Sequence, residues 1–155
     1  MRIDIVAAGR LKKGPEAAMV DDYLARFART GRGIGLPPVG LAEIEGRRGG
    51  GMTAEAELIA RAIPAGAALV MLDERGQQVT SPEFAARLAG FRDAARDVCF
   101  VIGGADGLDP ALRARADWQI AFGSMVWPHL LVRVMLAEQL YRAATILAGS
   151  PYHRD

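Results

Sequence analysis

The sequence predicts an α/β fold with a mainly parallel sheet and helices on both of its faces. Three observations favour this class. Short apolar runs alternate along the 155 residues with longer segments of helical periodicity. Glycines and prolines separate most of these segments. Hydrophobic residues make up 51% of the chain and charged residues 24%, a balance typical of a globular domain.

The first part of the chain predicts a strand, a helix and a second strand. Residues 2–8 alternate and then become apolar, and Gly9 ends this strand. A helix follows, with Pro15 in its first turn. Its apolar positions recur at helical spacing at Met19, Tyr23, Leu24 and Phe27. Residues 37–46 are predicted to form the second strand.

A glycine-rich run, Gly46 to Gly51, comes next and is predicted to be a mobile loop, because glycine disfavours regular elements. Thr53 is predicted to cap the following helix. Residues 67–76 then form a strongly apolar third strand with a polar end.

The second half is predicted to open with a helix that Ser81 caps and in which Pro82 is the first residue. The remaining segments are a buried strand that ends in glycines, a short helix, a strand and the longest helix, at residues 97–107, 109–116, 117–123 and 128–149. We expect one domain, residues 1–155, because 155 residues is a usual length for a single domain and the composition does not change along the chain.

Composition narrows the function. The net charge of +1 excludes a general polyanion binder, so any nucleic-acid partner would have to be recognised through a local patch and through shape. One cysteine, Cys99, is expected to pack as a small hydrophobe, which fits a reducing cytoplasm. Two histidines and one cysteine argue against a structural zinc site. No apolar run approaches the roughly 18 residues of a membrane span, and no signal peptide is expected.

Three segments follow predicted strands at the edge where parallel sheets bind ligands. They are residues 72–76, 103–107 and 122–129. The glycines of the second segment lack the spacing of a dinucleotide fingerprint or a P-loop. They form either a tight turn or a place where a ligand lies on bare backbone. The third segment is either packed core or a wrap around a flat ring, and His129 either starts a helix or belongs to the site.

The last helix carries Glu138 and Arg142, four residues apart, as in a surface ion pair or in a site. Arg133 lies at the edge of the same broad face. Residue types alone therefore indicate a ligand-binding α/β protein and nothing more specific.

Three ordered blocks go further. They read IGGADGL, then PHLLVRVMLAEQLYRA, then PYHR near the C-terminus. Together with the chain length and the start VAAG, they resemble the large-subunit (23S) ribosomal RNA methyltransferases that modify N3 of a pseudouridine. These are small members of the SPOUT class. The resemblance implies a C-terminal trefoil knot, S-adenosylmethionine bound in that knot, and an obligate homodimer.

The resemblance also implies which residues hold the cofactor, namely Leu72, Gly103, Phe122, Gly123, Ser124, Met125, Val126 and Trp127. This chain departs from the family at Phe122, Gly123 and Trp127, because members commonly have Leu-Ser at the first two positions and a smaller apolar residue before Pro-His. If backbone groups of this segment hold the adenine, the changed side chains do not prevent binding. Roles of the side chains at these three positions cannot be transferred from the family.

The C-terminal tail is expected to carry the chemistry. Tyr152 stacks on the substrate base, Arg154 stabilises the anion of the base, and either His153 or solvent takes the N3 proton. Arg133, Glu138 and Arg142 are expected to bind or orient the substrate, which is ribosomal RNA in the large subunit or the 70S ribosome. The alternatives are a non-catalytic ribosome-associated RNA-binding protein and a nucleotide-binding enzyme of flavodoxin-like shape.

Overall fold

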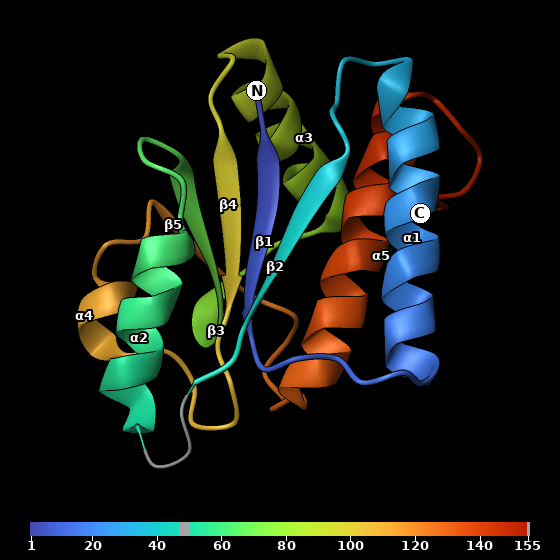
Figure 1. Cartoon of the computed structure of the whole chain (residues 1–155). Coiled ribbons are helices and arrows are strands. Elements are labelled where there is room, and N and C mark those ends of the chain that lie inside the picture. The colour runs from blue at the N-terminus through green and yellow to red at the C-terminus, as the bar shows by residue number, and fades with distance from the viewer. Residues whose placement is uncertain (47–49, 155) are drawn as a thin grey trace.

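The computed structural model of this chain describes residues 1–46 and 50–154. In this part of the chain five strands form one fully parallel sheet in the order β2-β1-β4-β3-β5. The strands are β1 (Ile3–Ala8), β2 (Val39–Ile44), β3 (Ala68–Gln78), β4 (Val98–Ile102) and β5 (Trp118–Ala121). The helices are α1 (Pro15–Arg32), α2 (Gly51–Ala62), α3 (Ser81–Asp93), α4 (Pro110–Arg113) and α5 (His129–Leu147). Figure 1 shows their arrangement.

The predicted α/β class with a parallel sheet is confirmed. The flavodoxin-like alternative is wrong, because that fold has the strand order 2-1-3-4-5, whereas β3 and β4 are exchanged here. No helix within the described residues has the length and apolar character that a membrane crossing requires.

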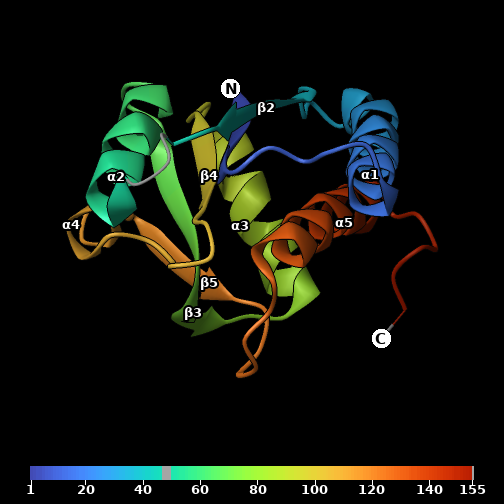
Figure 2. The same cartoon turned by 60° about the horizontal axis from the view of Figure 1, so that its bottom comes forward.

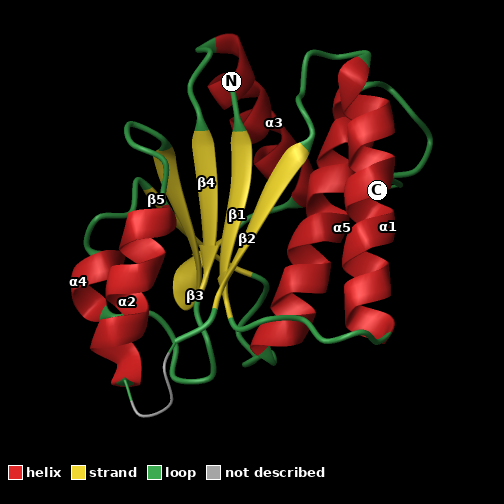
Figure 3. Ribbon diagram, in the orientation of Figure 1, coloured by secondary structure: helices red, strands yellow, loops and turns green. Residues whose placement is uncertain are grey.

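Different helices cover the two faces of the sheet (Figure 3). Helices α1, α3 and α5 share a core with one face, built around Ile5, Val70, Phe100, Phe27, Leu88 and Leu140. Helices α2 and α4 pack on the other, around Val6, Met71, Val101, Ile59 and Leu112. Successive residues of a strand point to opposite faces, so a strand covered on both sides is apolar throughout, as β4 is. Burial, with a smaller effect of Asp4, raises the pKa of Cys99 in this strand to about 12, which confirms that it packs as a hydrophobe.

Two predicted helix caps are wrong. Thr80, not Ser81, caps α3, because Thr80 and Glu83 have the spacing for two reciprocal bonds. The Thr80 hydroxyl accepts from the Glu83 N–H at 3.3 Å, and the Glu83 carboxylate accepts from the Thr80 N–H at 2.7 Å. Helix α2 begins at Gly51, so Thr53 lies inside its first turn and is not the cap. The rest of the predicted glycine-rich loop includes residues 47–49, which lie outside the described residues.

Two interpretations of helix faces also change. Met19 is 46% exposed, because the buried stripe of α1 runs through its neighbour Val20 and through Phe27. Helix α5 is the longest helix of the described chain and is apolar on several sides, as expected. However, α1 and α3 flank it, so its burial alone does not require a second protein copy.

A close backbone crossing joins the two strands that carry the ligand-binding edge. Strand β3 pairs with β5 up to Leu72, leaves register, and pairs again from Gln77. Both Leu72 and Gln77 are opposite Ile120. At the crossing, a Cβ at Gly76 would lie 2.6 Å from backbone atoms of Ile120. Only glycine fits here without a shift of the backbone.

The substitution Gly76→Ala should therefore destabilise the fold, because the methyl group collides with backbone rather than with a movable side chain. We expect a loss of about 1–3 kcal/mol in the free energy of unfolding, measured as a lower melting temperature. Gly90→Ala in α3 is the matched control. Nothing lies within 4 Å of its Cβ position, so it should be neutral or stabilising. Equal melting temperatures for Gly76→Ala and wild type would contradict the tight crossing.

Candidate functional site

The three segments that follow β3, β4 and β5 line one cavity of about 870 Å³. Its walls are the end of the first β3 section, the turn after β4, and the segment between β5 and α5. Met52 of α2, Arg113 of α4 and the first turn of α5 also contribute to the lining. Because parallel strands end at the same edge of the sheet, segments far apart in the sequence meet here, as predicted. The volume lies in the range of about 300–1,000 Å³ that is usual for ligand sites.

Of the eight residues expected to hold the cofactor, the cavity is lined by Leu72, Gly103, Phe122, Gly123, Met125, Val126 and Trp127. Ser124 is exposed and is not among the lining residues. His129, whose role the sequence left open, also lines the cavity. Asp73, Arg75 and Asp106 also line it and lie in the segments that the sequence marked, although no role was assigned to their side chains. Met52 and Arg113 line it too, and they were missed because nothing in their spacing connects them with those segments.

The turn after β4 owes its shape to glycine. A Cβ at Gly103 would lie 2.8 Å from the backbone carbon and oxygen of Gly107. Gly107 donates a backbone hydrogen bond to Gly104 at 3.0 Å and has a φ of +79°, so the turn closes on itself. The Gly104 N–H also donates to Glu55 of α2 at 3.4 Å. Gly103 therefore keeps this wall of the cavity thin and folded.

The segment after β5 contains the departures from the family pattern, and the structure connects two of them. The Trp127 indole N–H donates to the Phe122 carbonyl oxygen at 3.1 Å and closes the segment across its base. Gly123 has a φ of +111°, a conformation that side chains disfavour. Between them, Met125 and Val126 are 71% and 77% exposed. Two of the unusual residues, Phe122 and Trp127, thus close the segment by a hydrogen bond.

The C-terminal tail folds back on α5 around one carboxylate. Glu138 Oε1 accepts from Arg142 Nε at 3.0 Å, from Arg142 Nη2 at 2.6 Å and from the Tyr152 hydroxyl at 2.9 Å. Arg142 Nη1 also lies 3.2 Å from His153 Nδ1. A guanidinium can only donate, so Nδ1 accepts, and the neutral imidazole then carries its proton on Nε2. Arg154 is exposed.

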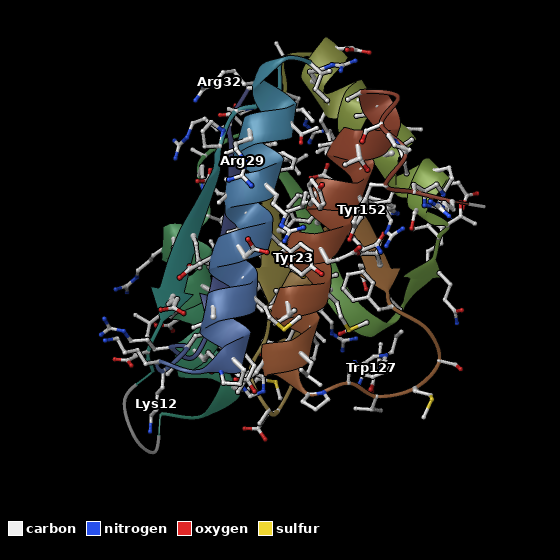
Figure 4. The ribbon with its side chains drawn as sticks, turned by 90° about the vertical axis from the view of Figure 1, so that its right-hand side faces the viewer. Lys12, Tyr23, Arg29, Arg32, Trp127 and Tyr152 are labelled. Atoms are coloured by element: carbon white, nitrogen blue, oxygen red, sulfur yellow. The ribbon has the colours of Figure 1, made fainter. Side chains whose placement is uncertain are left out.

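Tyr152 lies in an aromatic cluster on this side of the molecule. Its ring centroid is 4.6 Å from the ring centroid of Tyr141. The guanidinium carbon of Arg142 lies 4.9 Å from the centroid of the Tyr152 ring. Tyr23 of α1, labelled with Tyr152 in Figure 4, packs against Tyr141. Burial, followed by the hydrogen bond to Glu138, raises the pKa of the Tyr152 phenol. The hydroxyl is therefore protonated at neutral pH and serves as a hydrogen-bond donor.

The tail and the cavity of one chain lie apart. No tail residue in the described range lines the cavity, and every tail contact named above is to α5 or to another part of the tail. In Figure 2 the C-terminus lies beyond α1 and α5, away from α4 and the ends of β3 and β5. The structure brings Tyr152, His153, Glu138 and Arg142 together, but it does not bring them to the cavity of their own chain.

Arg133 does not occupy the substrate-facing position predicted for it. Its side chain is fully buried and donates from Nη1 to Glu43 at 2.7 Å, and from Nη2 to the carbonyl oxygens of Ala8 and Gly9 at 3.0 and 2.9 Å. Burial lowers the pKa of Arg133, and the Glu43 carboxylate opposes that shift. The residue ties α5 to the ends of β1 and β2, so its role in this structure is positional.

No cluster of three or more His, Cys, Asp or Glu side chains suited to a metal ion occurs in residues 1–46 and 50–154.

Comparison with known proteins identifies the family. A family model described as "Predicted SPOUT methyltransferase" matches residues 1–153. The chain is 71% identical over 155 residues to "Ribosomal RNA large subunit methyltransferase H" of Paracoccus denitrificans, over 100% of both chains. It is 64% identical to the protein of the same name from Ruegeria pomeroyi, over 99% of both. A solved "probable methylase family protein" from Haemophilus influenzae Rd KW20 has a TM-score of 0.51 at 13% identity, over 99% of this chain and 70% of that one, which shows the fold alone. The chain therefore belongs to the SPOUT methyltransferase family, together with the ribosomal RNA large subunit methyltransferases H that match it over almost their whole length.

Proposed function

We propose that this protein transfers a methyl group from S-adenosylmethionine to N3 of a pseudouridine in large-subunit ribosomal RNA, on the assembled ribosome in the cytoplasm. The observation that carries the proposal is that the three strand-end segments line one and the same cavity. The names of the relatives support the RNA substrate. The choice of N3 of a pseudouridine rests on the resemblance of the three sequence blocks.

The cavity fits the proposed cofactor. Leu72, Ile102 and Val132 offer apolar contacts for an adenine, next to the bare backbone of Gly103. Three carboxylates, Asp73, Glu74 and Asp106, also line the cavity and disfavour a phosphate-bearing ligand. When bound, S-adenosylmethionine supplies a methyl carbon that its sulfonium already makes electrophilic. The protein must therefore position the donor against the acceptor rather than activate the donor with a metal.

The tail provides what the base requires. N3 of a pseudouridine is a poor nucleophile until it loses its proton, and the ring anion then needs a cation or a donor nearby. Arg154 is exposed and suits this task. The lone pair of His153 Nδ1 already faces Arg142. We therefore propose that solvent takes the N3 proton while Arg154 stabilises the anion.

We further propose that the active site is composite, with the cavity of one protomer and the tail of a second. The two parts lie apart within a chain, so another copy must supply one of them. Exposed apolar residues are suited to that contact, namely Met125, Val126 and Trp127, which line the cavity, and Leu131 in the first turn of α5. A C₂ dimer would then hold two equivalent sites. The trefoil knot remains a prediction from the family.

The decisive experiment uses ribosomes that lack the modification. Purified protein, tritiated S-adenosylmethionine and these ribosomes should yield labelled large-subunit RNA, and mass spectrometry of the digested RNA should locate the methyl group on N3 of a pseudouridine. Binding of the ribosome without methyl transfer would instead identify a non-catalytic RNA-binding protein. A methyl group on another base would contradict the proposed target.

Gly103→Ala should weaken S-adenosylmethionine binding, and Gly103→Val should abolish it, because each Cβ forces the Gly107 backbone to move. Isothermal titration measures the affinity, and the melting temperature of each variant shows whether the fold persists. Gly90→Ala is again the control and should bind normally. Undiminished affinity of a folded Gly103→Val protein would place the cofactor elsewhere.

Deletion of residues 152–155, which include the undescribed Asp155, should abolish methyl transfer and leave cofactor affinity within about twofold, because these residues do not line the cavity. Arg154→Ala should reproduce most of that loss in the tritium assay. His153→Ala should reduce the rate less and leave its pH profile unchanged if solvent is the proton acceptor. A truncated protein that methylates at the wild-type rate would show that the tail is dispensable.

The composite site predicts complementation between two inactive proteins. The truncated chain has an intact cavity, and Gly103→Val has an intact tail. Mixed dimers contain one complete site, so random reassembly should restore about one quarter of the wild-type activity, since half of the dimers are mixed and each has one site of two. Sedimentation of the mixture should show dimers. Activity that stays at zero although mixed dimers form would contradict a shared site.

A further inference from the structure

One wall of the cavity contains a partly buried ion pair that the mechanism above does not use. Asp73 follows Leu72 where β3 leaves register, and its side chain is 6% exposed. Arg113 comes from α4, 40 positions later in the sequence, and its side chain is 22% exposed. Arg113 Nε lies 3.9 Å from Asp73 Oδ2, and both residues line the cavity.

This pair has unused hydrogen-bonding capacity. Among the described residues, Arg113 Nε is buried without a hydrogen-bond partner. Its separation from Asp73 is too long for a hydrogen bond. Asp73 Oδ1 accepts a hydrogen bond from the backbone N–H of Arg75 at 3.0 Å. The Arg75 side chain is 61% exposed, and its Nη1 lies 3.7 Å from Asp73 Oδ2. A buried guanidinium nitrogen without a partner is costly, and a ligand that supplies an acceptor removes this cost.

The chemistry of the pair defines what it can bind. A guanidinium forms its strongest contacts with a carboxylate, through two parallel N–H donors. An aspartate beside it accepts from an ammonium. A ligand that carries both groups on one carbon atom is an α-amino acid in its zwitterionic form. A phosphate would satisfy Arg113 but would face Asp73 and the lining carboxylate of Asp106.

We propose that Asp73 and Arg113 form the subsite for the amino-acid end of the cofactor, with the carboxylate on Arg113 and the ammonium on Asp73. This inference rests on the proposed function, because it assigns part of the same cavity. It adds two specificity-determining residues, which distinguish S-adenosylmethionine and its product from nucleosides that lack the amino acid. In this arrangement the apolar residues Leu72, Ile102 and Val132 and the turn at Gly103 contact the nucleoside part of the cofactor.

Two product-like ligands isolate this subsite. S-adenosylhomocysteine and 5′-methylthioadenosine share the adenine, the ribose and an uncharged sulfur, but only the first carries the amino acid. Isothermal titration of the wild-type protein should show tighter binding of S-adenosylhomocysteine. Arg113→Met retains an apolar stem and removes the guanidinium, so it should weaken the binding of S-adenosylhomocysteine by about 10- to 100-fold. Binding of 5′-methylthioadenosine should change by less than about twofold.

Further variants control for charge and folding. Arg113→Lys keeps the charge without the planar fork and should give an intermediate loss. Arg115→Met removes an exposed arginine just beyond the same helix and should leave both affinities unchanged. Asp73→Asn should weaken S-adenosylhomocysteine selectively. If Arg113→Met does not fold, the ratio of the two affinities in wild type and in Arg113→Lys provides the same test.

Each result decides the proposal. Equal wild-type affinities for the two ligands would overturn it, as would an Arg113→Met variant that loses both to the same extent. An equal loss of both ligands in Asp73→Asn would place Asp73 against the ribose and overturn its assigned role. Failure of the wild-type protein to bind either ligand would instead count against the proposed function itself.

Discussion

The candidate site depends on one close contact between backbones, that of Gly76 with Ile120. At this contact the register of β3 against β5 shifts, so residues 73–76 lie between two sections of β3 that both pair with β5. Asp73, at the start of this irregularity, lies in the wall of the cavity. The same contact fixes the end of β5, from which the segment with Phe122 and Trp127 departs. Two of the three walls are thus positioned by a single crossing that a methyl group would disturb.

The other end of that segment is anchored in a different way. It leads into α5, and Arg133 on the second turn of this helix is bonded to Glu43 and to two carbonyl oxygens at the end of β1. Glu43 also accepts from the Leu11 N–H at 2.8 Å, so the connection from β1 to α1 is tied to the same carboxylate. A buried arginine with one such partner is strongly destabilised when that partner is removed. The ionic contact therefore fixes the start of α5 against the ends of β1 and β2.

The order of the elements, the parallel sheet and the segments that meet at its edge followed from periodicity, because burial on two faces leaves a clear pattern in a strand. The residues at which helices begin did not follow from periodicity. Thr80 and Ser81 are both good N-cap residues, and only the contact with Glu83 distinguishes them. The segments that line the cavity were predicted where the backbone forms them, at Gly103 and from Phe122 onward, whereas their binding of a cofactor stays a prediction. The lining was not predicted where side chains from distant elements converge, because the proximity of Asp73 and Arg113 depends on how β3 bends. Arg133 shows the opposite case, since an arginine on an apolar helix has the same sequence pattern whether it faces RNA or a buried carboxylate.

The tail combines a tight attachment with an exposed end. Glu138 bonds Arg142 and Tyr152, and its second oxygen accepts from Gln139, which in turn accepts from Ser81 of α3. This chain of bonds connects the tail to two helices of the core layer. Tyr152 uses its hydroxyl and much of its ring to hold the tail, so less of it remains for a substrate base than the sequence implied. Arg154 is exposed and directly follows His153, whose Nδ1 lies 3.2 Å from Arg142 Nη1. Under the proposed function, a cation attached so close to a fixed point would need little reorganisation when charge develops on the base.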